Sequence, residues 1–148
     1  MHLFINEKQF EFWKLRRARI PNITIATNFG ISRQAVSKAL LTMDGKIETT
    51  LREMAKANKI AIIKLNPQLG VLLGRSIPLS VDAIIFVSAG HGVQVWYEHD
   101  GNCGACEEYA QCIELLWDYS EEIDIKLNRT ADPTKMAEEL FAKLKEMV

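Results

Sequence analysis

One histidine and three cysteines gather within fourteen residues in the second half of the chain: His99, Cys103, Cys106 and Cys112. A Cys-x-x-Cys pair that turns around a metal ion, with two further nitrogen or sulfur donors nearby, completes a tetrahedral zinc site. Iron–sulfur clusters use mainly thiolate ligands and sometimes histidine, so they fit the same residues. The sequence therefore predicts zinc or an iron–sulfur cluster, and the ligand types do not decide between the two.

The spacing of the thiols limits how they can meet at one ion. On a regular helix the residues from Cys106 to Cys112 would turn by about 600°, which leaves the two side chains about 120° apart. A shared site therefore requires Cys103 and Cys106 in a loop or first helical turn, with Cys112 alone projecting from the helix. His91, in a glycine-flanked turn, is the substitute fourth donor if His99 points away.

Other interpretations of the cysteines stay open. Cys103 and Cys106 can form a thiol redox switch or have no special role, and Cys112 can be a buried small apolar residue. A catalytic dithiol is less favoured, because a thioredoxin-like pair directly follows a strand, whereas this pair has a loop before it and a third cysteine nearby. Since no Ser/His/Asp set, phosphate loop or carboxylate pair stands out, we do not expect an enzyme.

A second group of side chains has the chemistry to read DNA bases: Ser32, Arg33, Gln34, Ser37 and Lys38. Arginine binds guanine and glutamine binds adenine through paired hydrogen bonds, while serine and lysine contact bases or phosphates. In a helix-turn-helix unit, the early outward residues of the second helix meet the base edges in the major groove. These five residues are therefore predicted to contact DNA.

The segment from Asn22 to Leu41 has the steric pattern that a helix-turn-helix unit requires. Ala26 is small where two helices cross closely, and Gly30, four residues later, permits the sharp turn. Apolar residues stand where the two helices must cover the first helix of the unit: Ile25, Ile31 and Val36.

Helical spacing predicts four helices in the first part of the chain. We expect one over about 7–19, a second over 23–29 and a third over about 33–43, capped by the residues before them. Asp44 and Gly45 are expected to interrupt the pattern, so that a fourth helix follows through about residue 58.

Residues 31–40 resemble the recognition helix of many bacterial and archaeal regulators. The wider pattern over 4–58 resembles the four-helix type of the LuxR-like and sigma-factor promoter-binding families. The resemblance implies double-stranded DNA as a partner and transcription regulation as the function. Small helical bundles that bind no nucleic acid share the short turns and apolar spacing, and this alternative stays open.

Charge is unevenly divided along the chain. Residues 1–64 hold 12 Lys and Arg against 5 Asp and Glu, whereas residues 65–148 hold 6 against 14. Because phosphate neutralisation supplies most non-specific affinity for DNA, the basic half favours a polyanionic partner. Arg16, Arg17 and Arg19 are expected to add phosphate contacts collectively.

From Lys59 the pattern changes from helical to extended. Short apolar or alternating runs predict strands over 60–65, 69–73, 83–87, 92–98 and 123–127. Helices are expected over 105–120 and from 133 onward. The sequence thus predicts an α+β fold, with an all-α helix-turn-helix domain over 1–58 and then a small α/β sandwich-like domain over 59–148, built from a short sheet and two helices.

These patterns together predict a cytoplasmic, homodimeric regulator whose carboxy-terminal domain holds the metal or cluster and senses metal or redox state. An odd number of cysteines suits a reducing compartment. No apolar run approaches the roughly 18 residues needed to span a bilayer, so no membrane partner is expected. In the alternative hypothesis, the metal is a structural zinc and the carboxy-terminal domain binds a small molecule or a protein. The effector stays unassigned.

Overall fold

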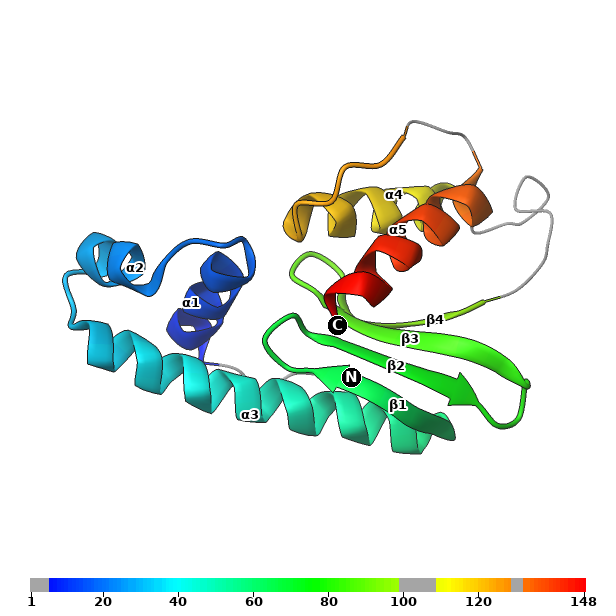
Figure 1. Ribbon diagram of the computed structural model, residues 1–148, viewed down its shortest axis with the longest axis horizontal. Coiled ribbons are helices and arrows are strands. Elements are labelled where there is room, and N and C mark those ends of the chain that lie inside the picture. The colour runs from blue at the N-terminus through cyan, green and yellow to red at the C-terminus, as the bar shows by residue number, and fades with distance from the viewer. Residues whose placement is uncertain (1–5, 99–108, 129–131) are drawn as a thin grey trace.

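Five helices and four strands make up the described part of the chain, in the order α1 (Glu7–Arg17), α2 (Asn22–Phe29), α3 (Arg33–Ala57), β1 (Ile60–Asn66), β2 (Val71–Ser76), β3 (Val81–Ser88), β4 (Gly92–Tyr97), α4 (Tyr109–Glu122) and α5 (Pro133–Met147). The computed structural model describes residues 6–98, 109–128 and 132–148 (Figure 1). The predicted α+β class is confirmed, with a helical region before the sheet. Within these three ranges, no helix is long and apolar enough to cross a membrane.

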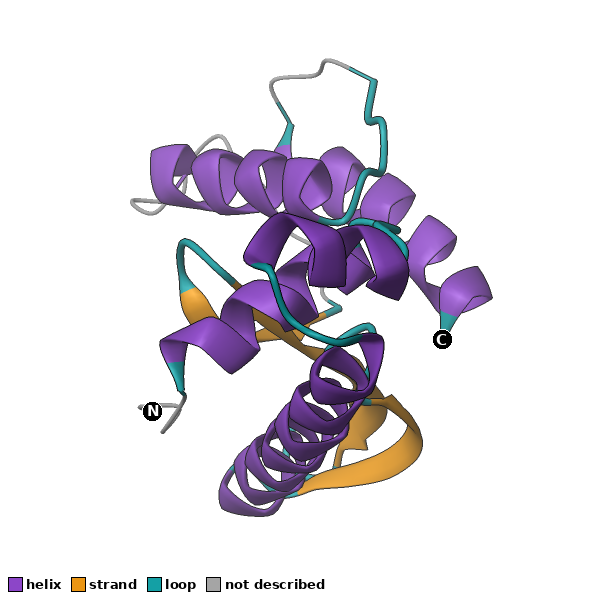
Figure 2. Cartoon of the chain, turned by 90° about the vertical axis from the view of Figure 1, so that its left-hand side faces the viewer, coloured by secondary structure: helices purple, strands orange, loops and turns teal. Residues whose placement is uncertain are grey.

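The four strands form one antiparallel sheet, in the order β1-β2-β3-β4. Successive side chains of a strand point to opposite faces. In β3, Ile84 and Phe86 therefore belong to one hydrophobic cluster, while Ile85 and Val87 belong to the other. Helix α3 covers the face that bears Ile85, and α4 and α5 cover the opposite face (Figures 1 and 2). The sheet is thus the middle layer of three.

The helices that precede the sheet share a hydrophobic cluster with it. Phe12 of α1 and Ile25 of α2 lie in the same buried cluster as Leu72 and Val87 of the sheet. Helix α3 makes the connection, because its first half packs against α1 and α2 and its second half, with Leu51, packs against the sheet. The orientation of α3 is therefore fixed from both ends.

The predicted break between a third and a fourth helix is wrong, because α3 runs without interruption from Arg33 to Ala57 over 25 residues. Its buried side chains recur at steps of three and four residues through the expected break: Val36, Leu40, Met43, Ile47, Leu51 and Ala55. Asp44 is held by paired contacts with Arg16, of which the Nη1–Oδ2 distance is 3.0 Å. Gly45 is exposed, where glycine costs a helix only about 1 kcal/mol relative to alanine. The described part of this segment, residues 6–58, therefore has three helices, and it departs from the four-helix type.

The strand predicted over 123–127 is also wrong, whereas the other four predicted strands are confirmed with shifted ends. Ile123 and Ile125 are buried in the cluster formed with α4 and α5. They belong to the helical layer, so they do not reach the backbone groups at a sheet edge. Helix α4 confirms the described part of the helix predicted over 105–120, and α5 begins as predicted, with Asp132 as its N-cap.

Candidate nucleic-acid interface

The turn between α2 and α3 has the backbone geometry that the sequence predicts. Gly30 adopts a left-handed conformation, with φ 64° and ψ 34°. The backbone N–H of Ile31 then donates to the carbonyl of Ala26 at 3.1 Å, which closes the end of α2. Ser32 caps α3, because its hydroxyl accepts from the backbone N–H of Ala35 at 3.1 Å. Three residues, 30–32, therefore suffice to connect α2 to α3.

The inward side chains of this unit hold α3 in a defined rotation about its axis. Ile25 and Val36 are fully buried, and Ala26 is buried where the two helices cross. Ile31 packs against the same cluster. Because these residues fix which side of α3 faces the core, they also fix which side faces solvent.

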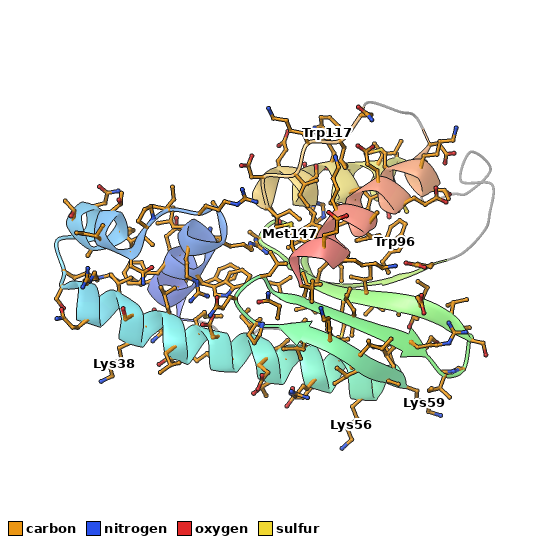
Figure 3. All side chains as sticks on the ribbon, viewed as in Figure 1. Lys38, Lys56, Lys59, Trp96, Trp117 and Met147 are labelled. Atoms are coloured by element: carbon orange, nitrogen blue, oxygen red, sulfur yellow. The ribbon has the colours of Figure 1, made fainter. Side chains whose placement is uncertain are left out.

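The side chains predicted to read DNA lie on that solvent-facing side, at the start of α3: Ser32, Arg33, Gln34, Ser37 and Lys38 are all exposed. No hydrogen bond or ion pair joins the side chains of Arg33, Gln34, Ser37 or Lys38 to any other residue in the described ranges. Figure 3 shows Lys38 pointing away from the body of the protein. This face of α3 is therefore accessible to a large partner.

One exposed apolar residue on the same helix was missed by sequence reasoning. Leu41 is 75% exposed and follows Ser37 by about one helical turn. The buried side chains of α3 recur every three or four residues, and Leu41 stands outside this spacing. Its exposure could have been predicted from that position. If the polar residues beside it read DNA as predicted, an exposed leucine here is suited to contact the methyl group of thymine.

Exposed cations lie in both halves of α3, but they have different neighbours. In the first half, neither Arg33 nor Lys38 forms an ion pair within the described residues. In the second half, Arg52 pairs with Glu48 at 3.8 Å, and Lys46 and Lys56 share the helix with Glu53. The first half is suited to a polyanion because it holds cations and no carboxylate before Asp44.

The three arginines predicted as phosphate contacts have different surroundings. Arg19 is exposed, in a left-handed conformation with φ 70°, and stays a candidate. Arg16 is engaged with Asp44, and its side chain is only 21% exposed. The prediction for Arg17 is wrong, because its side chain is 1% exposed and reaches no solvent where a phosphate could lie.

Arg17 instead links α1 to the sheet and to α4. Its Nη1 donates to the carbonyl oxygen of Val87 at 2.6 Å, and its Nη2 lies 3.8 Å from a carboxylate oxygen of Glu122. The guanidinium also lies over the ring of Trp13, at 4.4 Å from the centroid. Burial lowers the pKa of Arg17, and the negative charge of Glu122 opposes that shift, whereas burial raises the pKa of Tyr119. Arg17 is therefore a structural cation.

The predicted metal ligands His99, Cys103 and Cys106 lie outside the described residues. Cys112 is partly exposed in the first turn of α4, and the described ranges contain no group of three potential metal ligands. His91, the substitute donor, has its Nε2 at 2.8 Å from Oδ2 of Asp118 on α4. Its ring is thus held by a carboxylate of the helix that carries Cys112.

Comparisons with protein-family models, curated proteins and solved structures find no match to this chain. The chemistry of the interface therefore rests on its own geometry. That geometry is a capped helix, rotated by a buried core so that five polar residues face solvent at its start.

Proposed function

We propose that this chain is a sequence-specific DNA-binding transcription regulator, not an enzyme. The observation that carries the proposal is the tight turn between α2 and α3. It presents at the start of α3 the side chains of Arg33, Gln34, Ser37 and Lys38, which bind no other side chain among the described residues. Such a helix start fits the major groove, which is wide enough to admit an α-helix. Arg33 and Gln34 are the groups suited to guanine and adenine, and Arg19 is suited to a phosphate.

We also propose that two copies bind together to a two-fold symmetric operator. The start of a single α3 helix contacts few base pairs. Two paired helix-turn-helix units reach two half-sites that lie one turn of the DNA, about 34 Å, apart. The proposal therefore requires a homodimer on DNA. Light scattering of the protein with and without a selected operator measures this directly.

Arg33→Ala and Gln34→Ala are each expected to weaken binding to the preferred DNA sequence by about ten- to a hundredfold, since each paired contact contributes about 1–3 kcal/mol of discrimination. The DNA is a fragment selected from a random-sequence library by the unaltered protein. Gel shifts at fixed salt then compare its affinity with that of a scrambled fragment.

Arg52→Ala is the matched control, because Arg52 is an exposed arginine in the second half of the same helix. It should leave sequence preference unchanged. If Arg33→Ala and Gln34→Ala also leave sequence preference unchanged, these two side chains do not read bases. If the unaltered protein selects no sequence at all, the proposed function is wrong.

The carboxy-terminal cysteines are proposed to bind zinc or an iron–sulfur cluster that senses metal or redox state. The supporting observation is that α4 carries Cys112 near one end and, near the other, Asp118 and Glu122, which hold the β3–β4 turn. Glu122 lies beside Arg17 of α1. A shift of α4 would therefore act directly on contacts of the helix-turn-helix unit.

The metal content of anaerobically purified protein is expected to identify the group. Iron with a visible absorption band would support a cluster, and colourless zinc would support a structural or sensing site. If removal of zinc unfolds the protein, the structural alternative holds; if it changes only DNA affinity, the sensing role holds. Protein without either metal would contradict the proposal.

A further inference from the structure

A cleft of about 610 Å³ lies between α5 and the end of the sheet where β2 turns into β3. Its apolar floor includes Trp96 of β4 and Phe141 of α5, whose ring centroids are 5.7 Å apart. On the α5 side, the cleft is lined in part by the small residues Ala137 and Ala142, which leave room there. Figure 3 shows Trp96 beneath α5. The volume is in the range of clefts that take small molecules.

The positive and negative charges of the residues that line the cleft do not cancel. Arg75 is bound to Asp82 at 3.1 Å and to the carbonyl of Ser80 at 2.8 Å, and Lys145 is paired with Glu98. Both lining cations are therefore already neutralised by carboxylates of the cleft itself. Glu138 also lines the cleft, and it has no ion-pair partner in the described part of the chain.

The start of α5 does not reverse this charge balance. Thr134 lines the cleft in the first turn, where helix N–H groups favour anions. However, the carboxylate of Asp132 already accepts from the backbone N–H of Thr134 at 3.0 Å. The cleft thus combines an aromatic floor with an excess of one negative charge. An aromatic face and a nearby carboxylate both attract an ammonium group.

We propose that this cleft binds a small organic cation, an amine with an aromatic or apolar body. The amine lies near Glu138 and the body lies against Trp96 and Ala137. A phosphorylated or carboxylic ligand is disfavoured, because it would have to displace Asp82 or Glu98 from its own partner. The proposal does not rest on the proposed DNA binding, and failure of one leaves the other standing.

Three probes of nearly equal size separate charge from shape: phenethylamine, 2-phenylethanol and phenylacetate. Each is titrated into the full-length ¹⁵N-labelled protein while the indole N–H signal of Trp96 is followed, with Trp96→Phe used to assign it. Phenethylamine is expected to shift this signal saturably with a Kd of about a millimolar or tighter. The alcohol should bind more weakly, and the acid weakest of all.

Glu138→Gln is expected to weaken phenethylamine binding by about two- to fivefold, which is the range for a partly exposed charge contact. Glu121→Gln is the matched control, since Glu121 is an exposed glutamate of α4 that does not line the cleft. Equal or tighter binding of phenylacetate would overturn the proposal. So would the absence of a saturable shift with any probe up to about 20 mM, or equal effects of the two substitutions.

Discussion

Glu122→Ala is expected to lower the free energy of unfolding by about 3–5 kcal/mol, because it leaves a buried guanidinium without its counter-charge. The Glu122 carboxylate accepts from the Ser88 hydroxyl at 3.1 Å and from the backbone N–H groups of Ala89 at 3.1 Å and Gly90 at 2.9 Å. Arg17 lies on its other side and is 1% exposed. The substitution therefore removes three hydrogen bonds of the β3–β4 turn and the nearest negative charge to Arg17. Urea denaturation measures the loss.

A second substitution, at Arg17, tests whether the loss comes from the positive charge that Glu122→Ala leaves buried without a counter-charge. Arg17→Met alone should cost less, about 1–3 kcal/mol, since it leaves the Val87 carbonyl without its donor. Glu122 keeps its other hydrogen bonds in that variant, and the Nε of Arg17 has no hydrogen-bond partner in the described residues to lose. The variant with both substitutions should therefore be more stable than Glu122→Ala alone.

Glu121→Ala is the control for this cycle, because the neighbouring Glu121 is exposed, and it should change stability by less than about 0.5 kcal/mol. If the losses of the two single variants simply add in the double variant, Arg17 and Glu122 are not coupled. The ion pair would then contribute nothing to the attachment of α1 to the sheet, beyond its apolar packing and the hydrogen bonds to Val87 and Pro67.

The short turn between α2 and α3 could be predicted because its constraints are local. Gly30, Ser32 and the apolar residues around them act within a few residues of one another, so their spacing is visible in the sequence. The burial of Arg17 could also be predicted from its local spacing in the sequence. Arg17 stands four residues after Trp13, and therefore on the buried face of α1, whereas a count of arginines treats Arg16, Arg17 and Arg19 alike.

The continuity of α3 and the cleft could not be predicted in the same way, because they depend on residues far apart in the chain. Asp44 and Gly45 are typical of a helix end, but Arg16 binds Asp44 and the core holds Met43 and Ile47 on either side. The cleft forms only when α5 lies on the sheet. Its Glu98 and Lys145 are 47 positions apart, and no periodicity brings them together.

Gly70→Ala is the second substitution with a large expected effect, and it tests how closely α1 contacts the sheet. Gly70, in the turn between β1 and β2, has φ 75°, and a Cβ there would lie 2.7 Å from Cη2 of Trp13. The indole is not able to move aside easily. Its Nε1 donates to the carbonyl of Pro67 at 3.1 Å, and its ring stacks on Phe10 on one side. The added methyl group must therefore displace the turn or the helix.

Gly92→Ala separates this clash from the strain of the backbone, because Gly92 has φ 76° and a Cβ there would meet nothing within 4 Å. Both variants carry the cost of a left-handed alanine, about 1–2 kcal/mol. Gly70→Ala is expected to lose about 1–3 kcal/mol more, which is the usual cost of overpacking a core. Equal losses of unfolding free energy in urea denaturation would mean that the Trp13 side chain moves aside, and that α1 does not pack rigidly against the β1–β2 turn. A larger loss at Gly70 would mean that the sheet sets the position of α1, and through α1 the direction in which the start of α3 faces.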